Sequence, residues 1–217
     1  MKLPENIGME EAPVLEPASN CYKAVIQEGQ LKPGESIVVF GVGPLGLFSL
    51  QHATIAGAVN RIMIGMSSDR GTRSELAMKY GATHFLCSDE EPDLVGKVKE
   101  ICGENGVDLV VDAVGAAIVM QQAVDMVNYE GRIVRIGYNS KPYQNSFDKI
   151  TSKSITIRGH MGYNPESWRR SIALANAGML DLKSCISHTL PLEQFREGFE
   201  LMKSQKASKV RLVYPKD

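Results

Sequence analysis

The chain has 217 residues, a hydrophobic fraction of 43% and a formal net charge of −1, which are ordinary values for a protein with a buried core. A nearly neutral chain is not expected to bind nucleic acid or an anionic membrane surface. The chain contains no uninterrupted run of about 18 apolar residues. Its N-terminus lacks the apolar segment of a signal peptide, so we predict a cytoplasmic protein without membrane contact.

Apolar runs typical of β-strands alternate with helix-like stretches along most of the chain. The predicted strands are residues 36–40, 61–65, 84–87, 109–112, 132–136 and 154–158. The predicted helices lie between them, at residues 45–56, 72–80, 94–102 and 117–127. This alternation predicts an α/β fold, a doubly wound parallel sheet of six strands known as the Rossmann fold, with right-handed crossovers.

A glycine-rich turn, GVGPLG at residues 41–46, follows the first predicted strand and opens the first predicted helix. This order of strand, turn and helix is typical of dinucleotide binding. Gly41 permits the tight turn, Gly43 lets the backbone approach a pyrophosphate, and Gly46 lets the helix pack close to the strand. The phosphates are expected at the helix N-terminus, where unpaired N–H groups favour anions. We therefore predict cofactor contacts from Gly41, Gly43, Pro44, Leu45 and Gly46.

Two further loops are expected to reach the cofactor, because ligands of open α/β sheets bind outside the carboxyl ends of the strands. They are Val114 and Gly115 after the fourth strand, and Ile136, Gly137 and Tyr138 after the fifth. In the alternative interpretation, Gly115 only ends a strand and Tyr138 is a surface aromatic. We predict one dinucleotide-binding domain over residues 1–217, with a core at about residues 19–180 and flanking segments 1–18 and 181–217.

The choice between NAD and NADP depends on the end of the second strand, where NAD enzymes place a carboxylate near the ribose 2′-hydroxyl. No carboxylate follows this strand directly, and Asp69 lies further along the loop. We expect a 2′-phosphate to be surrounded by Ser67, Ser68, Arg70 and Arg73, because one arginine guanidinium can bind two phosphate oxygens at once. The sequence thus favours NADP over NAD. The alternative is that both arginines lie on a solvated helix start.

Cysteines and histidines give little indication of chemistry. The four cysteines are widely spaced, with no CxxC pair and no histidine at zinc-finger spacing, which argues against a structural zinc and for reduced thiols. The four histidines have no nucleophile or carboxylate at a suggestive spacing. His160 is expected to pack or to lie at the surface. No catalytic residue is predicted in this chain.

Several segments together resemble the medium-chain zinc-dependent alcohol dehydrogenases, most closely the polyol and threonine dehydrogenase branch. They are LEP at 15–17, LKPGE at 31–35, GVGPLG at 41–46, AMKYGAT at 77–83, DAVG at 112–115, GRIVRIG at 131–137, ISH at 186–188 and KVRLV at 209–213. The resemblance implies hydride transfer between a secondary alcohol and a nicotinamide cofactor. Family members carry an additional N-terminal domain with most of the zinc ligands, and this chain begins after it, so we expect the isolated chain to be inactive.

The resemblance also assigns roles to single residues. Glu16 corresponds to a carboxylate that approaches the zinc in the intact enzyme. Alternatively, it is a helix-start carboxylate stabilised by the helix dipole. Lys209 corresponds to a basic residue near the pyrophosphate, although a lone lysine is more often exposed. Residues 154–158 correspond to an edge strand through which two copies pair, so a homodimer is expected.

Two other functions remain open at this point. One is a nucleotide-binding or redox-sensing module that acts alone and catalyses nothing. The other is a fragment of a zinc-independent NADPH quinone or enone reductase. The presence of Glu16 in the LEP segment argues against the second.

Overall fold

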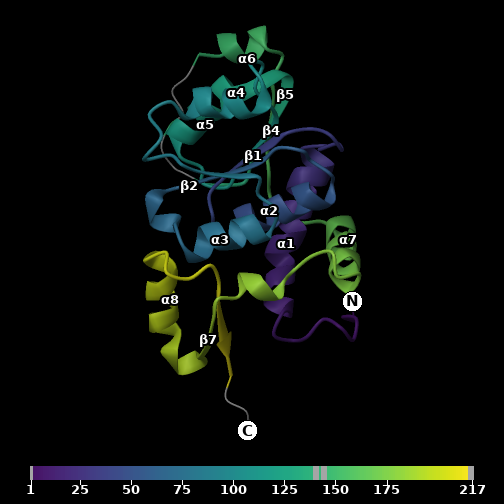
Figure 1. Cartoon of the computed structure of the whole chain (residues 1–217). Coiled ribbons are helices and arrows are strands. Elements are labelled where there is room, and N and C mark those ends of the chain that lie inside the picture. The colour runs from purple at the N-terminus through teal and green to yellow at the C-terminus, as the bar shows by residue number, and fades with distance from the viewer. Residues whose placement is uncertain (1, 139–141, 143–145, 215–217) are drawn as a thin grey trace.

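The computed structural model describes residues 2–138, 142 and 146–214. At its centre is a parallel sheet of six strands in the order β3-β2-β1-β4-β5-β6, which is the doubly wound order (Figure 1). The strands are β1 (Ile37–Phe40), β2 (Arg61–Gly65), β3 (His84–Cys87), β4 (Val107–Asp112), β5 (Val127–Arg135) and β6 (Thr156–Gly159). The six-stranded α/β fold expected from the sequence is therefore confirmed.

Both faces of the sheet are covered by helices, because its central strands are apolar on both sides. Successive residues of β1 point to opposite faces: Ile37 and Val39 pack with α2 (Pro44–Ile55) and α3 (Thr72–Lys79). Val38 and Phe40 pack with α4 (Leu94–Cys102) and α5 (Ala117–Met126). The sheet is thus the middle layer of a three-layer arrangement.

Three strands, β4, β5 and β6, begin two or more residues away from their predicted starts, and β4 begins at Val107, two residues early. β5 begins at Val127, five residues before the predicted start, because Val127 already pairs with Val107 of β4 ahead of a register shift. β6 begins at Thr156, two residues late, since Ser154 has a φ of +54° and belongs to a turn. Irregular pairing and a left-handed residue leave no signal in hydrophobic periodicity.

A third apolar cluster joins the two ends of the chain. It includes residues of α1 (Leu15–Tyr22), α2 and α7 (Pro165–Asn176), together with Leu180, Leu182 and Cys185. A π-helix (Lys23–Glu28) continues α1. The sequence indicated a helix start near Pro17 but missed α7, although Asn164 caps that helix by accepting a hydrogen bond of 2.8 Å from the Ser167 amide.

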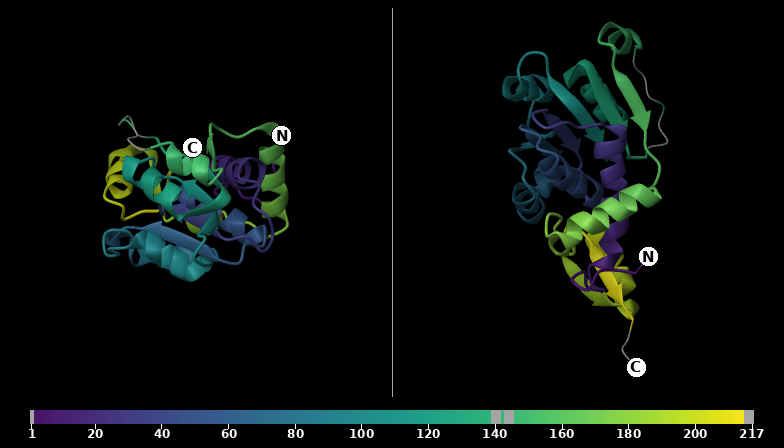
Figure 2. Two further views of the ribbon diagram at one scale, coloured as in Figure 1. Left: turned by 90° about the horizontal axis from the view of Figure 1, so that it is seen from above. Right: turned by 90° about the vertical axis from the view of Figure 1, so that its right-hand side faces the viewer.

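The C-terminal segment forms a small unit of its own at the opposite end from α4 and α6 (Figures 1 and 2). Strands β7 (His188–Pro191) and β8 (Val210–Val213) pair in parallel, and α8 (Phe195–Lys203) connects them. The remaining elements are α6 (Asp148–Ser152) and four 3-10 turns at Ala12–Val14, Ser67–Asp69, Lys183–Cys185 and Leu192–Gln194. Among the described residues, no helix has the length and apolar character needed to cross a membrane.

Candidate nucleotide-binding site

A cleft of about 560 Å³ opens at the carboxyl edge of the sheet, above β1, β2 and β4. Cofactors of this fold bind at this edge, where the strand order reverses next to β1. Three segments remote in sequence close its sides: the start of α5, the loop after β3 and the loop after α8. The lining residues include Gly41, Val42, Met66, Asp69, Ser88, Asp89, Val114, Ile118 and Gln205.

The glycine turn forms the floor at the N-terminus of α2. Gly41 has a φ of +97°, which a residue with a side chain rarely adopts. A Cβ on Gly46 would lie 1.7 Å from the Gly41 carbonyl oxygen, so α2 could not approach β1 with a larger residue there. A Cβ on Gly43, in contrast, would meet no described atom within 4 Å. Gly43 therefore faces open space at the helix end.

The N-terminus of α2 has the features of an anion site. Gly43 is the N-cap and makes no side-chain hydrogen bond to the helix, and Pro44 occupies the first turn. Without a capping side chain, the first N–H groups of the helix are left for a ligand. The helix dipole adds partial positive charge at the same point. The arrangement suits a pyrophosphate.

The loops after β4 and β5 are held together by one buried carboxylate and one arginine. Asp112 accepts hydrogen bonds from the amides of Val114 (2.9 Å) and Gly115 (2.7 Å). Burial raises the pKa of Asp112, and these two hydrogen bonds oppose that shift. Arg135 donates to the carbonyl oxygens of Gly115 (2.6 Å) and Gly137 (3.3 Å). Asp112 and Arg135, neither of which was predicted as a site residue, thus fix the two loops.

The predicted contact residues of these loops have different surroundings. Val114 lines the cleft and is 44% exposed. Ile136 is 8% exposed and belongs to the apolar core, so its side chain does not face the cleft. Tyr138 is 78% exposed. Lys209 does not line the cleft in the described part of the chain; it borders a separate cavity of about 310 Å³ between α8 and β8.

At the end of β2, the side chains expected to hold a 2′-phosphate already have partners. The amide and the hydroxyl of Ser67 both donate to the carboxylate of Asp89, the amide at 2.7 Å. Arg70 is paired with Glu90, and the Ser68 hydroxyl donates to Gln205. The sequence did not indicate that Asp89 would reach this position, because it lies after β3.

The Arg73 side chain also has partners already. Its guanidinium forms an ion pair of 2.9 Å with Asp69 and donates at 2.7 Å to the Ala207 carbonyl oxygen. Asp69 also accepts a hydrogen bond from the Met66 amide. The structure therefore gives no support to the argument that favoured NADP, which assumed that these donors were free.

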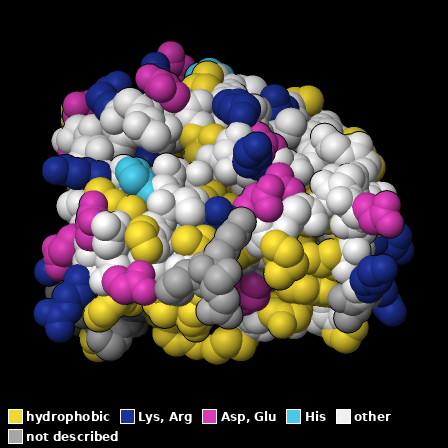
Figure 3. Space-filling model, turned by 90° about the horizontal axis from the view of Figure 1, so that it is seen from below, with side chains coloured by type: hydrophobic (Ala, Val, Ile, Leu, Met, Phe, Trp, Pro, Cys, Tyr) yellow, Lys and Arg dark blue, Asp and Glu magenta, His cyan; other side chains and the backbone are white. Residues whose placement is uncertain are grey.

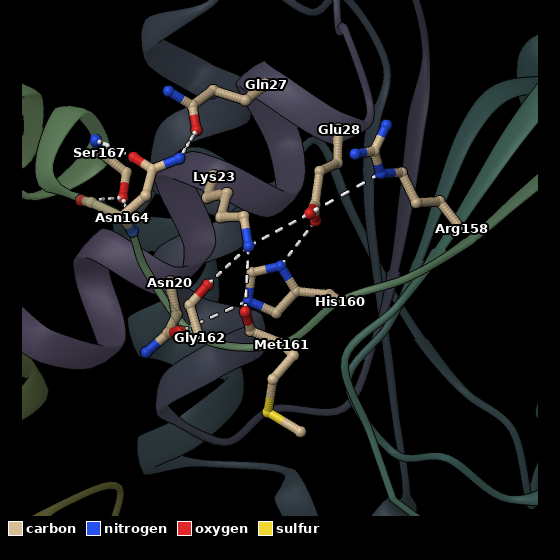
Figure 4. A network of polar contacts seen from close by, with 10 residues as sticks. All are labelled: Asn20, Lys23, Gln27, Glu28, Arg158, His160, Met161, Gly162, Asn164 and Ser167. Atoms are coloured by element: carbon tan, nitrogen blue, oxygen red, sulfur yellow. Dashed lines mark hydrogen bonds and ion pairs between the residues drawn. The ribbon is translucent and has the colours of Figure 1, made fainter.

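Glu16 lies in the first turn of α1, where it is exposed, as the dipole interpretation requires. Its carboxylate accepts a hydrogen bond of 2.6 Å from Asn20. Asn20 in turn contacts His160, and His160 contacts Glu28 (Figure 4). A chain of polar contacts therefore leads from Glu16 at the surface into the protein. His160 is 7% exposed and belongs to this network, so its side chain is buried among polar partners and does not lie at the surface.

No zinc site is formed by the described residues. A catalytic zinc takes about three protein ligands plus water. Residues 2–138, 142 and 146–214 contain no group of three or more His, Cys, Asp or Glu side chains able to hold a metal. Glu16 on its own does not fit a zinc ion.

Comparison with known proteins identifies relatives of one kind. Residues 44–177 match the family model described as zinc-binding dehydrogenase. An uncharacterised zinc-type alcohol dehydrogenase-like protein of Escherichia coli K12, YdjL, is 39% identical over 100% of this chain and 60% of its own length. The L-threonine 3-dehydrogenase of Bacillus velezensis is 32% identical over 98% of this chain and 60% of its own length.

A solved structure agrees. The alcohol dehydrogenase of Thermus sp. ATN1 superimposes with a TM-score of 0.90 and 32% identity, over 99% of this chain and 61% of that protein. The chain therefore spans about 60% of the length of these relatives.

Proposed function

The chain belongs to the zinc-binding dehydrogenase family, and we propose that it binds and orients the nicotinamide dinucleotide in an enzyme that transfers a hydride to or from a secondary alcohol. The observation that supports this proposal is the uncapped N-terminus of α2, which meets the glycine turn beside the cleft. In the proposed arrangement the pyrophosphate binds the first turn of α2, and the loops after β4 and β5 direct the remainder of the cofactor.

The proposed contact residues are the part of the sequence prediction that lies on the glycine turn and on the loops after β4 and β5. Gly41, Gly43, Pro44, Leu45 and Gly46 form the phosphate turn. Val114, Gly115 and Gly137 lie on the two loops fixed by Asp112 and Arg135. The Ile136 side chain packs in the apolar core. Its proposed role is to hold the loop after β5 in position, without contact to the cofactor.

The proposed substrate class is a polyol, a sugar alcohol or a hydroxy amino acid. It rests on the family and on the name of the Bacillus velezensis relative. Glu16 is exposed next to the Asn20 amide and would supply one ligand to a metal site that residues outside this chain complete. No step of the reaction is assigned to the described residues beyond cofactor binding.

A redox-sensing role receives no support from the thiols. Cys21 and Cys185 are fully buried, and burial raises the pKa of each thiol to about 12. Desolvation also raises the pKa of Cys87 and of Cys102. A thiol that stays protonated at neutral pH is a poor nucleophile and reacts slowly with oxidants.

Titration calorimetry of the purified chain with NAD⁺, NADH, NADP⁺ and NADPH tests the proposal. We expect binding of at least one nucleotide. Replacing Gly43 by Val should abolish it, because the added side chain fills the open space at the N-terminus of α2. A wild-type chain that binds none of the four nucleotides would refute the proposal.

We also propose that the chain forms a homodimer through β6. All four residues of this edge strand are exposed. The His160 amide donates to the Arg135 carbonyl oxygen in β5. Because the amides of a strand point alternately to its two sides, the amides of Thr156 and Arg158 also face β5. The amides of Ile157 and Gly159 face outward and are left for a partner strand. Light scattering should show a dimer for the wild type and a monomer for Ile157→Pro. A monomeric wild type would refute this edge.

The surface around α8 fits contact with another part of the protein. Figure 3 views the molecule from below, that is from the end at which α8 and β7 lie in Figure 1. Hydrophobic side chains gather on this face. Phe195 and Phe199 of α8 are 42% and 68% exposed, and both line the cavity beside β8. We propose that the additional domain of the family covers this surface.

A further inference from the structure

We propose that Asp89 makes the cleft selective for a dinucleotide with a free ribose 2′-hydroxyl, that is NAD(H), and excludes the 2′-phosphate of NADP(H). The inference rests on the proposed function, because it assigns the cofactor within the same cleft. It replaces the preference for NADP that the sequence suggested.

Asp89 lies next to the residues that follow β2. It follows β3, yet its two carboxylate oxygens accept hydrogen bonds from the amide and the hydroxyl of Ser67, just beyond β2. An amide and a hydroxyl on one residue after β2 are suited to bind a phosphate. Here the carboxylate of Asp89 already occupies those donors, and Asp89 lines the same cleft as Gly41 and Val42.

The hydrogen bonds from Ser67 also keep Asp89 charged. They lower the pKa of its carboxyl, so the group is an anion throughout the neutral range. Each carboxylate oxygen has a second lone pair and can accept a hydrogen bond from a ribose hydroxyl. A 2′-phosphate is negatively charged and offers only hydrogen-bond acceptors. The Asp89 carboxylate therefore repels a 2′-phosphate at the position where it would bind a 2′-hydroxyl.

The two arginines near the end of β2 already have partners, so neither is free to offset this repulsion. Arg73 is shared between Asp69 and the Ala207 carbonyl oxygen, and its side chain is only 11% exposed. Arg70 is paired with Glu90. The carboxylates of Asp69, Asp89 and Glu90 therefore lie near the end of β2 together with the two paired arginines, and Lys206 borders the adjoining cavity. A phosphate would have to break these pairs before it gained an arginine as a partner.

The experiment measures affinity both for the adenosine end of the cofactor and for the whole dinucleotide. Calorimetric titrations compare 5′-AMP with 2′,5′-ADP, and NAD⁺ with NADP⁺, for the wild type, Asp89→Asn and Glu91→Gln. Asp89→Asn keeps the size of the side chain and removes its charge. Glu91→Gln removes the same charge from the same loop; Glu91 does not line the cleft, so this variant is the matched control.

We expect the wild type to bind NAD⁺ at least about tenfold more tightly than NADP⁺, because one pair of like charges in contact costs a factor of this order. Asp89→Asn should reduce this ratio by about tenfold, and Glu91→Gln should leave it unchanged. Salt should weaken the wild-type preference, since the charges are exposed and screened.

The alternative outcomes separate the two proposals. Equal or tighter binding of NADP⁺ by the wild type overturns the selectivity assigned here and leaves dinucleotide binding intact. A ratio that Asp89→Asn does not change overturns the role of Asp89. Absence of binding for all four probes overturns the proposed function itself. Circular dichroism of each variant verifies that a changed ratio is measured on folded protein.

Discussion

The Nδ1 atom of His160 lies 2.7 Å from Oε2 of Glu28, and both side chains are almost completely buried (Figure 4). On the other side of the ring, Nε2 faces the Asn20 Oδ1 atom at 3.4 Å. The Asn20 amide nitrogen donates to Glu16, which fixes the orientation of the Asn20 side chain. Both nitrogens of His160 thus lie next to oxygen atoms, and the ring connects Asn20 with Glu28.

Glu28 is the centre of this network of polar contacts. Besides His160, the Lys23 ammonium lies 3.4 Å and the Arg158 guanidinium 3.8 Å from its carboxylate. Lys23 also donates to the carbonyl oxygens of Met161 and Gly162, which ties the π-helix to the segment after β6. The network therefore connects the start of the chain with the edge of the sheet.

We predict that Glu28→Gln lowers the free energy of unfolding by about 3 kcal/mol, because it removes a nearly buried carboxylate that contacts His160, Lys23 and Arg158. Chemical denaturation measures this change. Glu166→Gln is the control, since Glu166 pairs with Arg170 at an exposed site and should contribute about 0.5 kcal/mol or less. Equal effects of the two substitutions would contradict the central role of Glu28.

The two glycines at the start of α2 should respond in opposite ways to substitution. Gly43→Val should abolish nucleotide binding with little change in stability, because its Cβ meets no described atom and its φ is −83°. Gly46→Ala should destabilise the fold by about 1–3 kcal/mol through overpacking against Gly41. Thermal melts and calorimetry distinguish the two. A destabilised Gly43→Val variant would show that its loss of binding came from misfolding.

Stability should depend on pH through His52. Burial lowers the pKa of this histidine to about 4, and its Nε2 lies 2.9 Å from the Ala18 carbonyl oxygen. In the unfolded chain, a histidine has a pKa of about 6.5. Between these two pKa values, His52 is protonated in the unfolded chain and neutral in the folded chain, so the unfolded state binds more protons. The stabilising contribution is complete above pH of about 6.5 and decreases as the pH falls toward 4.

The expected loss over this range is about 3 kcal/mol, from the shift in pKa. Denaturation curves recorded across the range measure it. His52→Gln should flatten the pH dependence, whereas His84→Gln, at an exposed histidine, should not. An unchanged slope in His52→Gln would place the titrating group elsewhere.

The isolated chain should not oxidise alcohols. Hydride transfer requires the alcohol to be held next to the nicotinamide, and the described residues offer neither a metal-ligand set nor an assigned substrate site. We expect no formation of NADH from NAD⁺ with sorbitol or L-threonine, measured by absorbance, even after incubation with zinc. Zinc content after dialysis should be well below one ion per chain. Turnover above the buffer rate would contradict this prediction.

The sequence by itself determined the architecture and the phosphate turn. Strands such as Ile37–Phe40 and helices such as Pro44–Ile55 were predicted within one residue of their observed ends. Both are encoded locally, by apolar periodicity and by glycines whose spacing is set by one turn. The start of α7 is encoded locally as well, by the capping residue Asn164 followed by Pro165.

The selectivity of the cleft and the buried charge network were decided only by the tertiary structure. Ser67 and Asp89 are 22 residues apart, and His160 and Glu28 are 132 apart. Contacts of this kind depend on which strands become neighbours, and hydrophobic periodicity carries no information on side-chain partners across that distance. Arg70, which suggests a phosphate site in the sequence, is neutralised once folding brings Glu90 from the loop after β3 to it, whereas Arg73 pairs with Asp69 only four residues away.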